Sequence, residues 1–156
     1  MEKQDELVSV LNDLIRINND RVVGYERAVK ETKDSDVDMI ATFTKMADQS
    51  RKYVNELVQE VGRLGGDAAS DTTISGKVYR VWMDLKAAIS GKDRESIIGS
   101  CEYGEDVAQR AYEAALESDA YMSTEIRQLI SSQKSELKTS HDMIKKYRDM
   151  QDAISS

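Results

Sequence analysis

The sequence predicts an all-α protein, folded as an antiparallel four-helix bundle in a single domain over residues 1–156. The chain contains no proline, which suits long uninterrupted helices because a proline inside a helix costs about 3 kcal/mol. Its apolar residues recur at spacings of three and four, which is the period of one helix face. Runs of β-branched residues, which would favour strands, are absent.

The composition limits the partners and the setting of the chain. A net charge of −7 gives an acidic surface that repels phosphate backbones and anionic lipid, so we expect no nucleic acid and no membrane among the partners. The charged N-terminus does not resemble a signal peptide, and no stretch approaches the roughly 18 apolar residues of a membrane span. Cys101 is the only cysteine, which excludes an intrachain disulfide and fits a cytoplasmic location.

The first half of the chain predicts two long helices joined by a short turn. We expect them over residues 4–30 and 36–64, and the glycine pair Gly65-Gly66 ends the second. Ser35 and Asp38 have the spacing of a capping box at its start. The short turn makes the two helices antiparallel neighbours.

The second half predicts a short helix over residues 73–90 and two further long helices over residues 93–117 and 123–152. The apolar face of the helix over residues 93–117 consists mostly of small residues. Small side chains allow two helices to approach closely, either inside the bundle or across a dimer contact. These residues are Cys101, Gly104, Ala108, Ala111 and Ala115.

The connection between the second and third long helices sets the expected topology. It is roughly 25 residues long and carries its own helix, which is too long for a tight turn. Such a segment can cross the outside of the bundle. Two helix pairs joined by a long crossover form the ferritin-like pattern. We therefore expect a ferritin-like four-helix bundle with a short crossover helix, and plain up-and-down topology is the alternative.

Bundles of this pattern usually carry two iron ions, held by one Glu on each of two helices and by Glu-x-x-His on each of the other two. His141 is the only histidine, so two such motifs cannot exist. Phosphate-binding loops and nucleophile elbows are also absent from the sequence, and we expect no cofactor and no catalytic residues. The remaining metal-ligand candidates are Glu26, Asp48 and Glu105, which would hold a divalent ion such as Fe or Mn.

Polar residues on or beside the apolar faces predict a polar layer at the centre of the bundle. Its candidates are Asn18, Arg51, Gln133 and His141. One interpretation is a hydrogen-bonded layer that fixes helix register, because a buried polar group without a partner costs about 1–3 kcal/mol. A second is a salt bridge from Arg51 to Glu26 or Glu105, and a third is a reduced metal site. An inward Arg51 would argue against the third, since its charge repels a cation.

Several longer motifs are spread over nearly the whole chain. They are Leu11-Asn12-Asp13-Leu14 with Gly24-Tyr25-Glu26, Arg51-x-Tyr53 with Leu64-Gly65-Gly66, the run from Trp82 to Ala88 with Gly91, Cys101 to Asp106 with Tyr112 to Leu116, and Ser140-His141-Asp142. Together they resemble an uncharacterised bacterial family, a domain of unknown function with a ferritin-like bundle. The resemblance implies the fold and a bacterial cytoplasmic setting, and it implies no reaction. Relatives at the level of the fold include stress-associated bundles, ferritins and rubrerythrins.

Two functional hypotheses follow. The first is a non-catalytic, stress-associated bundle that acts through protein interaction and forms a homo-oligomer, with a dimer favoured. The second is a degenerate ferritin-like protein that binds a metal ion through carboxylates. The two differ in whether Glu26 and Glu105 bind metal.

Overall fold

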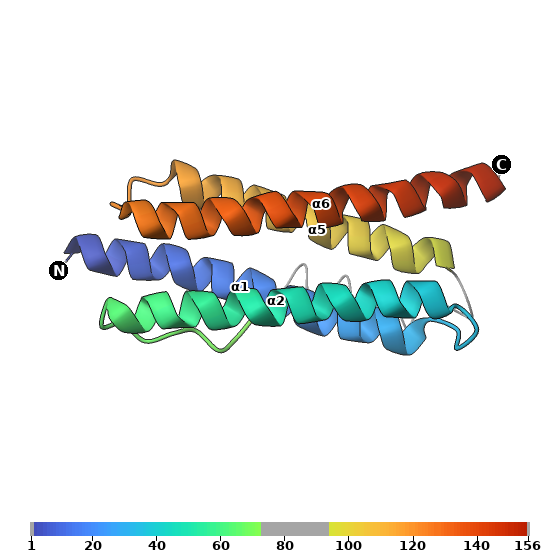
Figure 1. Cartoon of the computed structure of the whole chain (residues 1–156), viewed down its shortest axis with the longest axis horizontal. Helices are drawn as coiled ribbons and strands as arrows, with labels where there is room; N and C mark the ends of the chain where they lie inside the picture. Colours follow the sequence, from blue (N-terminus) through green and yellow to red (C-terminus); the bar gives the residue numbers. More distant parts are fainter. Residues whose placement is uncertain (1, 73–93, 156) are drawn as a thin grey trace.

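The computed structural model describes residues 2–72 and 94–155, in which four long helices form a bundle (Figure 1). They are α1 (Glu2–Glu31), α2 (Val37–Arg63), α5 (Arg94–Glu117) and α6 (Thr124–Ser155). Each corresponds to a long helix expected from the sequence, with ends that differ by three residues or fewer. The crossover helix expected over residues 73–90 lies outside the described residues. Within residues 2–72 and 94–155, no helix combines the length and apolarity needed to cross a bilayer.

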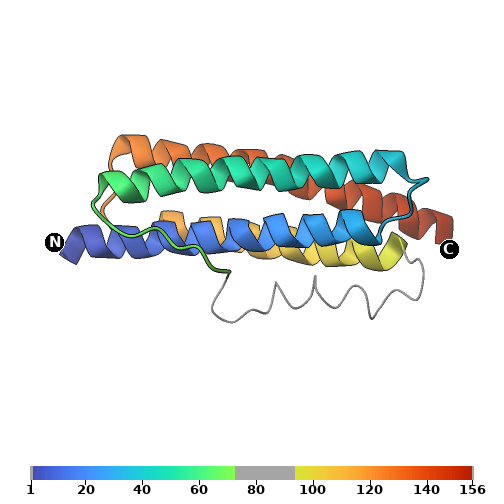
Figure 2. The ribbon, with the colours of Figure 1, turned by 90° about the horizontal axis from the view of Figure 1, so that it is seen from below.

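The helices are arranged as two hairpins. α1 packs along α2, α5 packs along α6, and α1 also contacts α5, whereas α2 and α6 make the sparsest contact of the four neighbouring pairs. α2 and α5 run in the same direction, so the chain leaves α2 at one end of the bundle and enters α5 at the other (Figures 1 and 2). This is the ferritin-like order. It confirms the four-helix prediction and excludes the up-and-down alternative.

The first part of the connection after α2 is held against α1. The side-chain amide of Asn12 donates to the carbonyl of Asp67 (3.0 Å) and its carbonyl accepts from the Ala69 N–H (2.8 Å). One to two turns further along α1, Arg16 pairs with Asp71 at 2.9 Å and Asn19 donates to its carbonyl. Polar residues at one-turn spacing on α1 therefore direct the chain along the outside of the bundle (Figure 2).

α2 ends as its glycine pair predicts. Gly65 has φ 76°, in the left-handed region that glycine enters without a steric penalty. Its N–H donates to the carbonyl of Gly62 and the Gly66 N–H donates to the carbonyl of Val61, both at 3.0 Å. These two bonds form a Schellman motif, which satisfies carbonyls that the last turn of a helix leaves free.

The start of α2 differs from the prediction. The N-cap residue is Asp36, and it makes no side-chain capping hydrogen bond. The Ile40 N–H instead donates to the carbonyl of Asp36 at 3.1 Å. The capping box predicted for Ser35 and Asp38 is wrong, because the helix begins one residue too late for that spacing.

The core lies along the length of the bundle and draws on all four helices, with Leu11, Phe43, Ile98 and Ile130 fully buried. The small residues of α5 face this core: Cys101, Gly104, Ala108 and Ala115 are buried. They allow α5 to approach its neighbours inside the chain. Because they are buried there, this face is not available for a dimer contact.

Candidate functional site

A layer of polar side chains crosses the centre of the bundle, where a fully apolar core would be simpler to build. It includes one or more buried residues from each helix: Asn18 and Arg21 on α1, Ser50 on α2, Glu105 on α5, and Gln133 and Ser140 on α6. Buried polar groups are costly unless they are hydrogen-bonded, so the contacts of this layer decide its chemistry.

Arg21 and Glu105 form an ion pair in which both side chains are 0% exposed. Nη2 and Nε of Arg21 lie 2.7 and 3.2 Å from Oε2 of Glu105. The hydroxyl of Tyr25 donates to the same oxygen, and the guanidinium lies 5.2 Å from the centre of the Tyr25 ring. Within the described part of the chain, Oε1 of Glu105 has no hydrogen-bond partner. Among the described residues, the carboxylate is therefore hydrogen-bonded at one oxygen only.

The surroundings fix the protonation of this cluster. Burial lowers the pKa of Arg21, but the nearby Glu105 and Tyr25 outweigh burial and leave the pKa raised above its ordinary value. Burial, together with the negative charge of Glu105, holds the pKa of Tyr25 well above its ordinary value. Arg21 is thus a permanent cation and Tyr25 a neutral donor at physiological pH.

A chain of hydrogen bonds leads from Arg21 through all four helices. Nη1 of Arg21 donates to the hydroxyl of Ser50, which donates to Oδ1 of Asn18 at 2.9 Å. Nδ2 of Asn18 donates to the hydroxyl of Tyr112 at 2.8 Å. Tyr112 donates to Gln133 at 2.6 Å, and Gln133 donates to Glu56 at 3.0 Å. Each link joins two different helices, so the chain fixes the register of all four.

A second branch leads from Arg21 toward the space between α2 and α6. Nη2 of Arg21 donates to Oε1 of Gln49 at 3.2 Å, and the hydroxyl of Ser140 donates to the same oxygen at 3.1 Å. Nearby, the hydroxyl of Tyr53 donates to Glu136 at 2.7 Å, and burial first, then Glu136, raises the Tyr53 pKa. Polar groups therefore line the bottom of the space between α2 and α6.

Of the four residues expected at the polar centre, Asn18 and Gln133 lie in the layer, His141 lies at its outer side, and Arg51 lies at the surface. Asn18 and Gln133 connect the layer across helices. Nε2 of His141 is 2.5 Å from Asp106 on α5, and the side chain is 23% exposed. Burial lowers the pKa of His141, but hydrogen bonds to Asp106 and Asp142 outweigh it and raise the pKa above 6.5.

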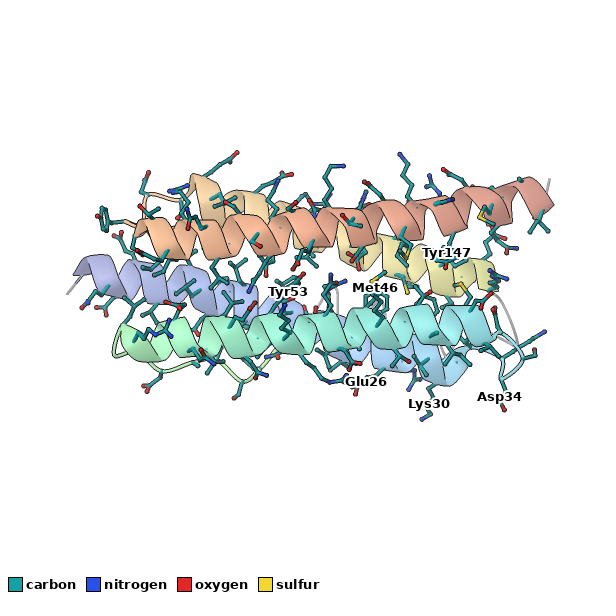
Figure 3. The ribbon with its side chains drawn as sticks, viewed as in Figure 1. Glu26, Lys30, Asp34, Met46, Tyr53 and Tyr147 are labelled. Carbon is teal, nitrogen blue, oxygen red and sulfur yellow. The ribbon has the colours of Figure 1, made fainter. Side chains whose placement is uncertain are left out.

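Arg51 lies outside the polar centre, which corrects its predicted position, whereas the ion pair with Glu26 that the sequence offered as one alternative is present. Its side chain is 44% exposed and pairs at the surface with Glu26 and Asp48, which are 55% and 66% exposed. Figure 3 shows Glu26 on the outer side of the bundle. The inward cation is Arg21. The sequence signal for it is its place four and three residues from Tyr25 and Asn18, on the buried face of α1.

The donor set does not fit the di-iron centre that the fold implies. Glu26 and Asp48 point to Arg51 at the surface, whereas Glu105 is buried in the core beside Arg21. Among residues 2–72 and 94–155, no three His, Cys, Asp or Glu side chains lie close enough together to hold one metal ion. Glu105, the carboxylate that does lie at the centre, is already paired with Arg21, and the charge of Arg21 would repel a metal cation.

The fold is similar to that of two solved structures. A point mutant of Dps1 from Mycobacterium smegmatis matches with a TM-score of 0.74 and 10% identity, over 94% of this chain and 97% of that chain. A ferritin-like diiron-carboxylate protein from Bacillus anthracis matches with a TM-score of 0.63 and 11% identity, over 100% of this chain and 99% of that chain. At these identities the similarity shows the fold alone. No curated protein sequence matches the chain.

The sequence itself matches one family model, described as a domain of unknown function (DUF2383), over residues 6–118. The match spans α1, α2 and α5, and so includes Arg21, Tyr25, Ser50 and Glu105 of the polar layer. It agrees with the resemblance found in the sequence motifs. The chain therefore belongs to the DUF2383 family, with the fold of ferritin-like bundles.

Proposed function

We propose that this chain is a non-catalytic ferritin-like bundle that acts through protein interaction in the bacterial cytoplasm. The observation that carries the proposal is the buried ion pair between Arg21 and Glu105. A guanidinium is charged at every physiological pH, so it supplies at the centre of the bundle the positive charge that metal ions supply in metal-binding relatives of the fold. The proposal also includes a stress-associated role, and that part rests on the kinds of protein that share the fold.

Metal analysis tests this proposal directly. Protein purified without chelator is expected to contain no stoichiometric Fe, Mn or Zn, and its thermal midpoint is expected to stay constant when any of them is added. An ion that binds the native state alone would raise the midpoint by mass action. The variants Glu26→Gln and Glu105→Gln are compared with Glu113→Gln, which removes an exposed carboxylate about two turns beyond Glu105 on α5.

A second candidate function is carboxylate metal binding. One observation favours it: Oε1 of Glu105 is buried and has no hydrogen-bond partner in the described part of the chain. Bound metal near one ion per chain, lost in Glu26→Gln or Glu105→Gln but retained in Glu113→Gln, would establish this function and overturn the first. Arg21 beside that carboxylate is the reason for ranking it second.

We extend the proposal to self-association as a homodimer. Val37 begins α2 and Ile154 lies in the last turn of α6, at the same end of the bundle, and they are 67% and 75% exposed (Figure 1). Exposed apolar side chains at one end of a molecule favour contact between that end and a second copy, because the contact removes them from water. Sedimentation velocity is expected to give twice the mass of the 17.6 kDa chain, and a monomer mass at high protein concentration would reject the dimer.

A further inference from the structure

A groove separates α2 from α6, the neighbouring helices with the sparsest contact. It encloses about 490 Å³ between Met46 and Tyr53 on α2 and Met143 on α6. A second hollow, of about 540 Å³, shares Met143 and continues along α6 to Met150. Figure 3 shows Met46 and Tyr53 on the edge of α2 that faces α6, with Tyr147 on the facing edge of α6. At 1.5 Å per residue, the stretch of α6 from Glu136 to Met150 is about 21 Å long.

Hydrogen bonds across the groove hold its two walls at a fixed separation. The hydroxyl of Tyr53 reaches Glu136 at 2.7 Å, and the hydroxyls of Thr42 and Tyr147 lie 3.2 Å apart. Between these two bridges, Ser140 donates to Gln49 on the floor. The groove is therefore a formed feature of the bundle, with polar links at its floor and methionines on its walls.

The charges on the rim of the groove are unbalanced. Of the rim carboxylates, Asp48 pairs with Arg51 and Asp142 pairs with Lys138. Glu136 accepts from the hydroxyl of Tyr53, a neutral donor that does not offset a charge, so one carboxylate stands against three rim lysines. The rim lysines are Lys45 and Lys52 on α2 and Lys146 on α6, and all three are exposed. In residues 2–72 and 94–155, no carboxylate lies within ion-pair distance of any of them. A chain of net charge −7 thus presents unpaired positive charge along one apolar groove.

These features select among occupants. A second copy related by a two-fold axis would place the same groove opposite itself, and lysines on both rims would then face lysines. An acidic partner would meet them with opposite charge. Methionine side chains adapt to varied apolar surfaces, and amphipathic helices commonly dock in grooves of this length and character.

We propose that the groove between α2 and α6 binds an amphipathic helix of an acidic partner protein. Apolar side chains of that helix pack on Met143 and Met150, over the buried Met46, and carboxylates along its edges lie opposite the lysines of the rim. The inference rests on the proposed function of protein interaction and names the chemistry of the partner.

The test uses the full chain with ¹³C-labelled methionine methyl groups and two synthetic helical peptides. Both peptides carry the same leucine face, with glutamate flanking it in one and lysine in the other. The chain has seven methionines, and single Met→Leu changes assign the signals of Met46, Met143 and Met150. The glutamate peptide is expected to shift these three signals and to leave Met122, which lies before the start of α6 and does not line the groove, unshifted. The lysine peptide is expected to shift none.

Two charge-reversal variants locate the binding. Lys45→Glu with Lys52→Glu reverses the α2 rim and is expected to weaken binding of the glutamate peptide by about tenfold. Lys30→Glu with Lys33→Glu changes the net charge equally at the turn between α1 and α2, and is expected to leave binding unchanged. Figure 3 shows Lys30 on the side of the bundle away from the groove. All four lysines are exposed, so the variants are expected to fold.

Three results would overturn the inference: equal shifts with both peptides, equal loss of binding in both double variants, or shifts of Met46 and Met143 on simple dilution of the protein. The last would assign the groove to a second copy. None of these results depends on metal. A metal-free protein that ignores the glutamate peptide would reject the groove alone, whereas stoichiometric metal would reject the proposed function.

Discussion

At the scale of single residues, the two oxygens of Glu105 have different surroundings. Oε2 accepts hydrogen bonds from Arg21 and Tyr25, whereas Oε1 is buried and has no partner within the described residues. The polar atoms on the Arg21 side of the layer are instead densely bonded, through Ser50, Asn18 and Gln49. Each residue on the Arg21 side of the layer satisfies polar atoms of its neighbours. Removing one of these residues would therefore leave a neighbour without a hydrogen bond and lower stability.

Asn18 gives the residue-scale prediction. In Asn18→Leu the hydroxyl of Ser50 loses its acceptor and Tyr112 loses a donor, so we expect the free energy of unfolding to fall by about 1–3 kcal/mol. Arg51→Ala removes only exposed ion pairs and is expected to change it by less than about 1 kcal/mol. Urea unfolding followed by circular dichroism measures both. An equal loss in the two variants would contradict the placement of Arg51 at the surface.

Arg21 shows why the sequence predicted the layer but not its cation. Spacings of three and four along α1 accept either Arg21 or its neighbour Val22 on the inner face, and hydrophobicity favours the valine. In the structure Arg21 is fully buried and Val22 is only partly buried. The partner that makes this burial possible, Glu105, lies 84 residues away on another helix. No spacing within one helix reveals such a pair.

At the scale of elements, the long helices were predictable because their signals are local. Apolar periodicity marked α1, α2, α5 and α6 to within three residues, and the glycine pair marked the end of α2. The capping box at Ser35 failed because one residue of shift removes its geometry. The groove between α2 and α6 was not predictable, since the separation of two helices depends on the side chains of both helices together.

The end of α2 offers a matched pair of glycine substitutions. Gly65→Ala places a side chain at φ 76° and is expected to lower stability by about 1–2 kcal/mol. Gly62→Ala adds a methyl group inside the helix with no heavy atom within 4 Å, and is expected to raise stability by about 0.5–1 kcal/mol. Thermal unfolding of the two variants checks the opposite signs. A shift in the same direction for both would show that α2 does not end at Gly65 as described.

His141 and Asp106 join α6 to α5, and they give a pH prediction. The pKa of His141 in the folded chain is raised above its ordinary value of 6.5, against the effect of burial, by Asp106 and Asp142. A raised folded pKa gives stability that is fully present below about pH 6.5 and is lost as the pH rises through the folded value. The stability difference between the unmodified chain and His141→Gln is therefore expected to shrink as the pH rises.

Unfolding curves across that pH range measure the difference, and proton NMR of the single histidine measures the pKa itself. Asp106→Asn is expected to lower this pKa, because it removes the largest favourable partner of the imidazolium. A stability difference that stays flat or grows with pH would show that the contact between His141 and Asp106 does not persist in solution.

At the scale of the whole molecule, the polar layer connects two hairpins. α1 and α2 form one, α5 and α6 form the other, and contact between α2 and α6 is sparse. Much of the specific connection therefore lies between α1 and α5, where Arg21 meets Glu105. A buried ion pair is weak evidence of net stabilisation, because desolvating two charges costs about as much as their attraction returns. Its clearer effect is to penalise any arrangement that separates the partners.

This argument predicts how substitutions at the pair combine. Arg21→Met or Glu105→Leu alone strands a buried charge, and each is expected to lower the free energy of unfolding by about 3–5 kcal/mol. The triple variant Arg21→Met, Glu105→Leu and Tyr25→Phe strands none and also removes the hydroxyl that would lose its acceptor. We expect it to be more stable than either single variant, as measured by urea unfolding. If the losses simply add, Arg21 and Glu105 act independently, and the charge at the bundle centre does not hold the two hairpins together.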